Sequence, residues 1–92
     1  MKLRCPARIR TRRGETFYGE CVELTVEGLS VHSEYVPQFR EMLEIIVMAP
    51  DLAGKPVAPL RLTTEVMHCC AVEPGSRFEM AMTIVARSHE DS

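Results

Sequence analysis

The sequence predicts an all-β protein, a small six-stranded antiparallel β-barrel with at most one short helical turn. Apolar and polar residues alternate in most segments of the 92-residue chain, which is the period of a β-strand. Turn signals that contain glycine or proline separate the alternating runs. A closed barrel leaves no exposed sheet edge, so this architecture suits several short strands in one small chain. We expect one barrel over residues 1–87 and a polar tail over residues 88–92.

The first expected strand, residues 2–12, has an apolar face and a cationic face. Its apolar positions alternate along the chain: Leu3, Cys5, Ala7 and Ile9. The positions between them carry Lys2, Arg4, Arg8, Arg10 and Arg12. A hairpin turn is expected at residues 13–15 and a second strand at residues 17–25, because Gly14 lies between the two alternating runs.

Gly28 marks the next turn, because glycine can adopt the positive φ that a tight turn or bulge requires. A short third strand follows at residues 29–33. The segment 35–41 contains Pro37 and is either a loop or a single helical turn. Residues 42–49 are apolar on both faces, which predicts a central, well-covered strand, and residues 50–59 are rich in glycine and proline and predict a loop.

The last two strands are the longest alternating runs. In the fifth, one inner face is expected to hold Leu60, Leu62, Thr64, Val66, His68, Cys70 and Val72. A turn at Pro74 and Gly75 leads into the sixth, whose expected inner face holds Phe78, Met80, Met82, Ile84 and Ala86. The sixth strand is expected to end before the polar tail.

Charge is distributed unevenly, although the formal net charge is only -2. Six of the 11 basic residues lie in the first thirteen positions, and no acidic residue lies among them. The remainder of the chain carries 13 acidic residues against five basic ones. A block of one sign usually meets a partner of the other sign or forms a solvated surface.

Several functional classes are disfavoured. The longest uncharged apolar run, residues 45–50, is far shorter than the roughly 20 residues that cross a bilayer, and arginines occupy the place of a secretory signal, so we expect a cytoplasmic protein. Neither a metal site nor catalysis is expected. The four cysteines lack Cys-x-x-Cys spacing, His32, His68 and His89 are scattered, and there is no glycine-rich phosphate loop or spaced carboxylate pair.

The arginine-rich strand is the strongest functional signal. Guanidinium groups are always charged, make bidentate contacts with phosphate and stack on bases, which suits a nucleotide or a nucleic acid. An alternative is that the outer face simply pairs with glutamates of neighbouring strands. Nucleic acid is the less favoured partner, because the rest of the chain is acidic and only Phe17 and Tyr18 lie near the arginines as stacking platforms.

Residues 7–84 resemble a PilZ domain, a six-stranded β-barrel of bacterial regulatory proteins that in many members binds cyclic di-GMP. The resemblance rests on Gly-Glu-Cys-Val-Glu-Leu-Thr-Val-Glu-Gly-Leu-Ser-Val at residues 19–31. It is similar to the family motif of Asp or Asn, any residue, Ser, any two residues and Gly. Here Glu23 stands for Asp or Asn, Thr25 stands for Ser, and Gly28 is retained. Arg4-Cys-Pro-Ala-Arg8 has the spacing of the family's second motif, Arg-x-x-x-Arg.

The resemblance implies a regulatory binding module without a resident cofactor. Arg4 and Arg8, helped by Arg10 or Arg12, would hold the phosphates and stack on guanine of cyclic di-GMP. Glu23 and Thr25 would read the base while Gly28 shapes the turn; this completes the expected ligand-binding set. Alternatively, the barrel is a degenerate member that binds no cyclic di-GMP and acts as a protein adaptor. A protein effector is expected in either case, and the module is a monomer or a homodimer.

Overall fold

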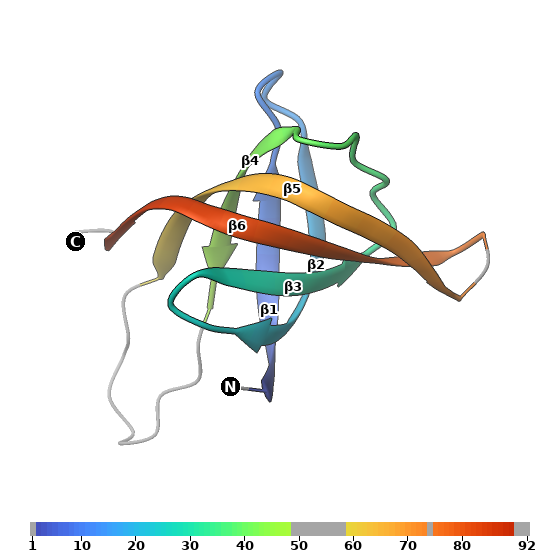
Figure 1. The fold of residues 1–92 in the computed structure, drawn as a ribbon, viewed down its shortest axis with the longest axis horizontal. Coiled ribbons are helices and arrows are strands. Elements are labelled where there is room, and N and C mark those ends of the chain that lie inside the picture. Colours follow the sequence, from blue (N-terminus) through green and yellow to red (C-terminus); the bar gives the residue numbers. More distant parts are fainter. Residues whose placement is uncertain (1, 49–58, 74, 90–92) are drawn as a thin grey trace.

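The computed structural model describes residues 2–48, 59–73 and 75–89. The elements, coloured along the sequence in Figure 1, are β1 (Lys2–Arg10), β2 (Thr16–Leu24), β3 (Gly28–Ser33), β4 (Met42–Val47), β5 (Leu60–Glu73) and β6 (Arg77–His89). The expected loop at residues 50–59 lies outside the described residues except for Pro59.

The strands close into a single barrel in the order β1-β2-β3-β6-β5-β4, and β4 pairs back onto β1. Every pairing is antiparallel. The predicted six-stranded antiparallel barrel is therefore confirmed. The segment between β3 and β4, which the sequence left open as a loop or a helical turn, is a loop. Nowhere in the described ranges is there a helix that could span a membrane.

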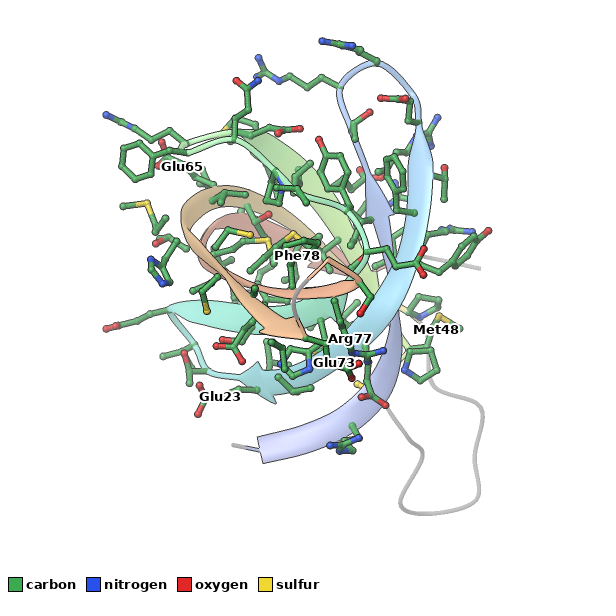
Figure 2. The ribbon with its side chains drawn as sticks, turned by 90° about the vertical axis from the view of Figure 1, so that its right-hand side faces the viewer. Glu23, Met48, Glu65, Glu73, Arg77 and Phe78 are labelled. Atoms are coloured by element: carbon green, nitrogen blue, oxygen red, sulfur yellow. The ribbon has the colours of Figure 1, made fainter. Side chains whose placement is uncertain are left out.

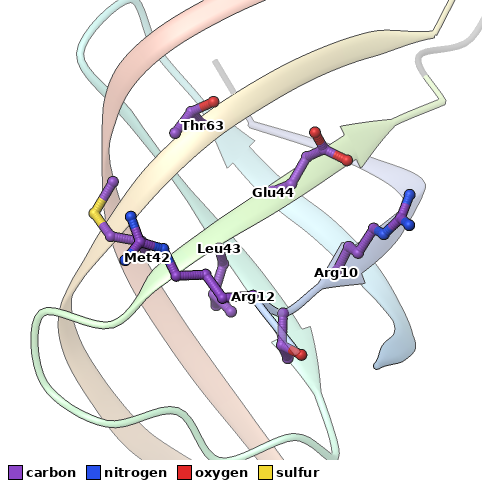
Figure 3. Close-up of a pocket in the computed structure, with 7 residues that line it drawn as sticks. Arg10, Arg12, Met42, Leu43, Glu44 and Thr63 are labelled. Carbon is purple, nitrogen blue, oxygen red and sulfur yellow. The ribbon is translucent and has the colours of Figure 1, made fainter. Parts of the chain in front are cut away.

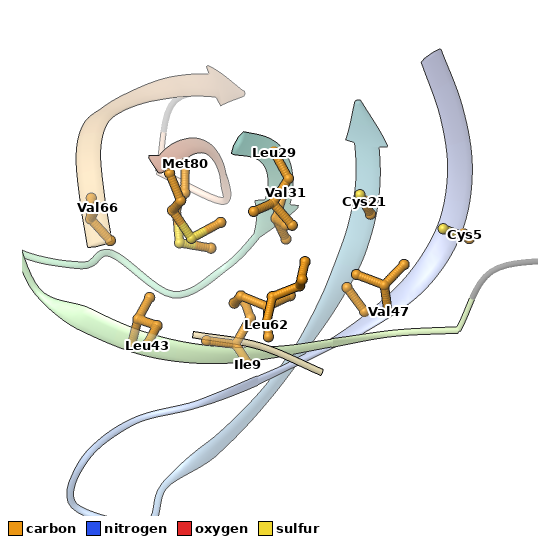
Figure 4. Close-up of a cluster of buried hydrophobic side chains, with 13 residues drawn as sticks. Cys5, Ile9, Cys21, Leu29, Val31, Leu43, Val47, Leu62, Val66 and Met80 are labelled. Atoms are coloured by element: carbon orange, nitrogen blue, oxygen red, sulfur yellow. The ribbon is translucent and has the colours of Figure 1, made fainter. Parts of the chain in front are cut away.

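Inward-facing side chains from all six strands fill the barrel (Figure 4). The buried cluster is Cys5, Ala7, Ile9, Cys21, Leu29, Val31, Leu43, Ile45, Val47, Leu62, Val66, Met80 and Met82. Cys5 and Cys21 are opposite each other in the β1–β2 register, and both are free thiols. Burial, with a smaller effect of Cys5, raises the pKa of Cys21 to about 12. These two thiols therefore belong to the core and are poor nucleophiles at neutral pH.

The predicted inner face of β5 is correct only for its first half. Leu62, Thr64 and Val66 are buried, but a β-bulge lies between Val66 and His68. An extra residue in one strand shifts the alternation by one position, because successive side chains point to opposite faces. Beyond the bulge Cys69 packs against the core. The expectation that His68, Cys70 and Val72 face inward is wrong, since all of them are exposed.

β6 is longer than the sequence pattern predicts. It continues to His89, which pairs with Leu60, so the backbone remains in the sheet through residues expected to form a tail. A register shift at Val85 leaves Val85 and Ala86 exposed, and the predicted inward position of Ala86 is therefore wrong. Residues 90–92 of the expected tail lie outside the described ranges.

Candidate functional site

The outer surface of β1 and of the turn that follows it carries a line of cations, called here the arginine row: Arg4, Arg8, Arg10 and Arg12. All four side chains are exposed, while Cys5, Ala7 and Ile9 between them are buried. The predicted separation of the strand into an apolar and a cationic face is thus confirmed. Arg12 follows the end of β1 and lies in the β1–β2 turn, where Gly14 has a φ of 89° and its N–H bonds to the Thr11 carbonyl at 3.0 Å.

The neighbours of the row come from strands that are distant in the sequence. Arg8 lies opposite Tyr18 of β2 on one side and opposite Ile46 of β4 on the other. Neighbouring strands are about 4.8 Å apart, so these three side chains form a line across the outer surface. Two residues further along β1, Arg10 lies between Thr16 of β2 and Glu44 of β4.

Among the described residues, an ion pair is found for only one member of the row. Arg4 Nη1 lies 3.3 Å from Glu20 Oε1, and Arg77 Nη2 lies 3.6 Å from the same oxygen. Within residues 2–48, 59–73 and 75–89, Arg8, Arg10 and Arg12 form no ion pair or side-chain hydrogen bond. Pairing with neighbouring glutamates therefore does not explain these three arginines.

A hollow of about 290 Å³ lies between Arg10 and Arg12 on the outer side of β4 (Figure 3). The remainder of its lining is formed by Thr11, Met42, Leu43, Glu44 and Thr63. Arg12 is directed toward Met42, and Arg10 is directed away from it, so the two guanidinium groups border different ends of the hollow. The carboxylate in its wall is engaged with another cation, because Glu44 Oε2 lies 3.8 Å from Arg61 Nε.

The second part of the predicted site, Glu23 to Gly28, forms the end of β2 and the turn into β3. Thr25 N–H donates to the Gly28 carbonyl at 2.9 Å. Thr25 Oγ1 also accepts from the N–H groups of Gly28 and Glu27, at 3.1 and 3.2 Å. The hydroxyl of Thr25 thus holds the turn together. Glu23 is exposed and pairs in register with Lys2 and Ser30.

Gly28 is required for a different reason than the sequence suggested. Its φ is not in the positive region, which holds only Gly14 and Gly75 among the glycines of the described chain. A Cβ at Gly28 would lie 2.4 Å from the carbonyl oxygen of Met82 on β6. The absence of a side chain therefore allows β3 to approach β6 closely at the start of the strand.

The structure does not bring the two parts of the predicted site together at one point. Tyr18, which is opposite Arg8, precedes Glu23 by five residues on β2, a separation of about 16 Å at about 3.3 Å per residue. Glu23 and Met48, which lies near Arg8, are at opposite sides of the view in Figure 2. Arg4 is the member of the row nearest to Glu23. A ligand in contact with both parts would have to lie along the strands.

The sequence did not predict the surroundings of Phe17 and Ile46 correctly or completely. Phe17, expected beside Tyr18 as a stacking platform, instead stacks on Tyr35, with ring centroids 4.4 Å apart. Ile46 lies in the segment 42–49 that was expected to be apolar on both faces, but its position beside Arg8 depends on the pairing of β1 with β4, for which the sequence holds no local signal. In the described part of the chain, no cluster of three or more His, Cys, Asp or Glu residues could hold a metal ion.

Comparisons of the chain with protein-family models, with curated proteins and with solved structures give no match.

Proposed function

We propose that the protein is a bacterial regulatory binding module of PilZ type that binds cyclic di-GMP on the outer face of β1. The observation that carries the proposal is the set of three exposed arginines, Arg8, Arg10 and Arg12, that have no partner among the described residues. Such a module acts in the cytoplasm, and ligand binding changes its interaction with a protein effector.

The arginines support an anionic ligand for an energetic reason. Alternate positions on one face of a strand lie about 7 Å apart, so like charges there repel one another, and this repulsion is relieved when a phosphate binds between them. Guanidinium groups can make two parallel hydrogen bonds to one phosphate, which fixes the orientation of the ligand. The ligand has two phosphates, so a row of cations suits it better than a single charged pocket.

The Glu23 to Gly28 segment has a supporting role in this proposal. Thr25 and Gly28 hold the turn, and the turn carries the exposed carboxylate of Glu23. A carboxylate can accept hydrogen bonds from the edge of a guanine. A cyclic dinucleotide that extends along β1 and β2 from Arg8 toward Arg4 would approach Glu23 with one of its bases.

A protein adaptor that binds no cyclic di-GMP is the second candidate. It is favoured by an apolar hollow of about 360 Å³ between the β3–β4 loop and β5. Val36 and Phe39 of the loop line this hollow and are exposed. Exposed apolar side chains beside a hollow are typical of a protein-binding surface.

Titration calorimetry with cyclic di-GMP at near-physiological salt tests the proposal. We expect measurable heat for the wild type and an affinity about 10- to 100-fold lower for Arg8→Ala, because a hydrogen bond to a charged group contributes about 1.5–3 kcal/mol. Arg40→Ala is the matched control. Arg40 is an exposed arginine outside the row, and its Nε lies 2.8 Å from Glu65 Oε2. Glu23→Ala reports whether the ligand reaches the turn.

Absence of heat at tens of micromolar protein would remove cyclic di-GMP as the ligand and favour the adaptor. In that case, a pull-down with wild type and with Phe39→Ala would examine the apolar hollow. Loss of one specific partner in Phe39→Ala would support the adaptor, and equal recovery with both proteins would count against it.

A further inference from the structure

Another hollow, called here the Tyr18 hollow, lies beside Arg8, and its floor is apolar. It measures about 310 Å³ and is lined by Pro6, Ala7, Arg8, Tyr18, Ile46, Met48 and Pro59. Ile46 forms part of the floor: it points to the outer side of β4, between the inward Ile45 and Val47, and yet only 3% of it is exposed. Met48, on the rim, is labelled in Figure 2. The outer face of the barrel therefore has a small apolar depression next to Arg8, a cation that pairs with no residue in the part of the chain that the structure describes.

Tyr18 forms the wall of this depression on the β2 side. It is 73% exposed and lies opposite Arg8 in the β1–β2 register. Its hydroxyl group has no hydrogen-bond partner among the described residues. A tyrosine ring so exposed has its flat surface available to a ligand, and aromatic rings stack well on other flat rings.

The combination of these groups defines the chemistry of the occupant. The exposed ring of Tyr18 favours a flat ligand group, and the apolar floor at Ile46 favours a group without charge. Arg8 and the adjacent Arg10 favour a ligand that also carries a negative charge beside this flat group. The volume is at the lower end of the roughly 300–1,000 Å³ of small-molecule sites, which suits a single flat ring system. An acidic peptide would satisfy the arginines but would make no use of the stacking surface.

We infer that the Tyr18 hollow is a nucleobase site, in which the base of a phosphate-bearing ligand stacks on Tyr18 above Ile46 while the arginine row holds the phosphate. This inference rests on the proposed function, because it takes cyclic di-GMP as the ligand. It assigns to Tyr18 a role in base binding. It also applies to a mononucleotide, which allows a separate test.

The first arm of the test is titration of cyclic di-GMP into wild type, Tyr18→Ala, Tyr18→Phe and Phe39→Ala. Stacking of one base contributes about 1–3 kcal/mol, so Tyr18→Ala is expected to bind about 5- to 100-fold more weakly. Tyr18→Phe keeps the ring and is expected to bind within about twofold of wild type. Phe39→Ala removes an equally exposed ring from another surface and leaves the affinity unchanged. All melting temperatures should agree, because both rings are exposed.

The second arm compares guanosine 5′-monophosphate with ribose 5-phosphate, which has the same phosphate but no base. Wild type is expected to prefer the nucleotide, and Tyr18→Ala is expected to lose that preference. If Tyr18→Ala binds cyclic di-GMP as well as wild type while Arg8→Ala does not, the base site is overturned and the proposed function stands. If wild type binds no cyclic di-GMP but still prefers the mononucleotide, the proposed function fails and the base site stands. Absence of both effects overturns both.

Discussion

The arginine row and the Thr25–Gly28 turn differ in what the rest of the barrel requires of them. The turn residues are occupied within the fold: the Thr25 hydroxyl accepts two backbone N–H groups, and Gly28 leaves room for the carbonyl of Met82. Arg8, Arg10 and Arg12 make no comparable contact with any described residue. Residues of the first kind are needed for folding whether or not a ligand exists. Residues of the second kind contribute little to folding, so their abundance on one strand needs a functional reason.

Substitutions in these two regions are therefore expected to have different effects on stability and on binding. Substitutions in the turn should lower the free energy of unfolding and affect binding only through the fold. Substitutions of the unpaired arginines should leave the free energy of unfolding unchanged and affect binding directly.

The largest loss of stability is expected for Gly28→Ala. The added Cβ would lie 2.4 Å from a backbone oxygen, which cannot move aside as a flexible side chain can, so we expect a loss of about 3 kcal/mol in urea unfolding. Gly14→Ala is the control: its site is open, and only the φ of 89° opposes the substitution, at about 1 kcal/mol. A Gly28→Ala variant no less stable than Gly14→Ala would refute the close approach of β3 to β6.

Thr25→Ala should have a smaller effect, about 1 kcal/mol, because the Gly28 and Glu27 N–H groups lose an acceptor but remain accessible to water. Thr25→Ser keeps the hydroxyl and is expected to unfold within about 0.5 kcal/mol of wild type. Equal stability of the Ala and Ser variants would mean that the hydroxyl does not hold the turn.

Arg4→Ala tests the paired member of the row. Its contact with Glu20 is at the surface, and exposed ion pairs contribute about 0–1 kcal/mol, so thermal unfolding should shift slightly and the shift should vanish at high salt. The neighbouring pair of Arg77 with Glu20 remains in this variant and limits the effect. A loss well above 1 kcal/mol would show that Arg4 supports the barrel as the turn does.

The smallest effect on stability is expected for the double variant Arg8→Ala with Arg10→Ala, which should remain within about 0.5 kcal/mol of wild type or become slightly more stable as repulsion falls. Its affinity for cyclic di-GMP should fall more than that of Arg4→Ala. A double variant that unfolds easily would remove the distinction between the two regions.

The sequence predicted the architecture because one physical signal, the alternation of apolar and polar residues, is repeated in most of the strands. Alternation predicted the buried Cys5, Ala7 and Ile9 correctly. It was wrong for His68 because a bulge changes the phase of the alternation without a change in composition. The extension of β6 to His89 was also not predictable from composition, since those residues are polar and are held by backbone pairing with β5.

The candidate site was predicted in its parts but not in its arrangement. The cationic face of β1 follows directly from the positions of the arginines. The distance between Arg8 and Glu23, and the position of Ile46 beside Arg8, depend on strand register and on the order of strands around the barrel. These properties arise from long-range pairing, which a single sequence does not encode locally.

If cyclic di-GMP binds on Arg8, Arg10 and Arg12, as proposed, amide chemical shifts recorded during its titration should change at these residues. We expect the largest shifts from Arg8 to Arg12 and at Tyr18 and Ile46 on the neighbouring strands, with smaller shifts at Glu23. Shifts confined to the Thr25–Gly28 turn or to the β3–β4 loop, or no shifts at saturating ligand, would contradict this proposal.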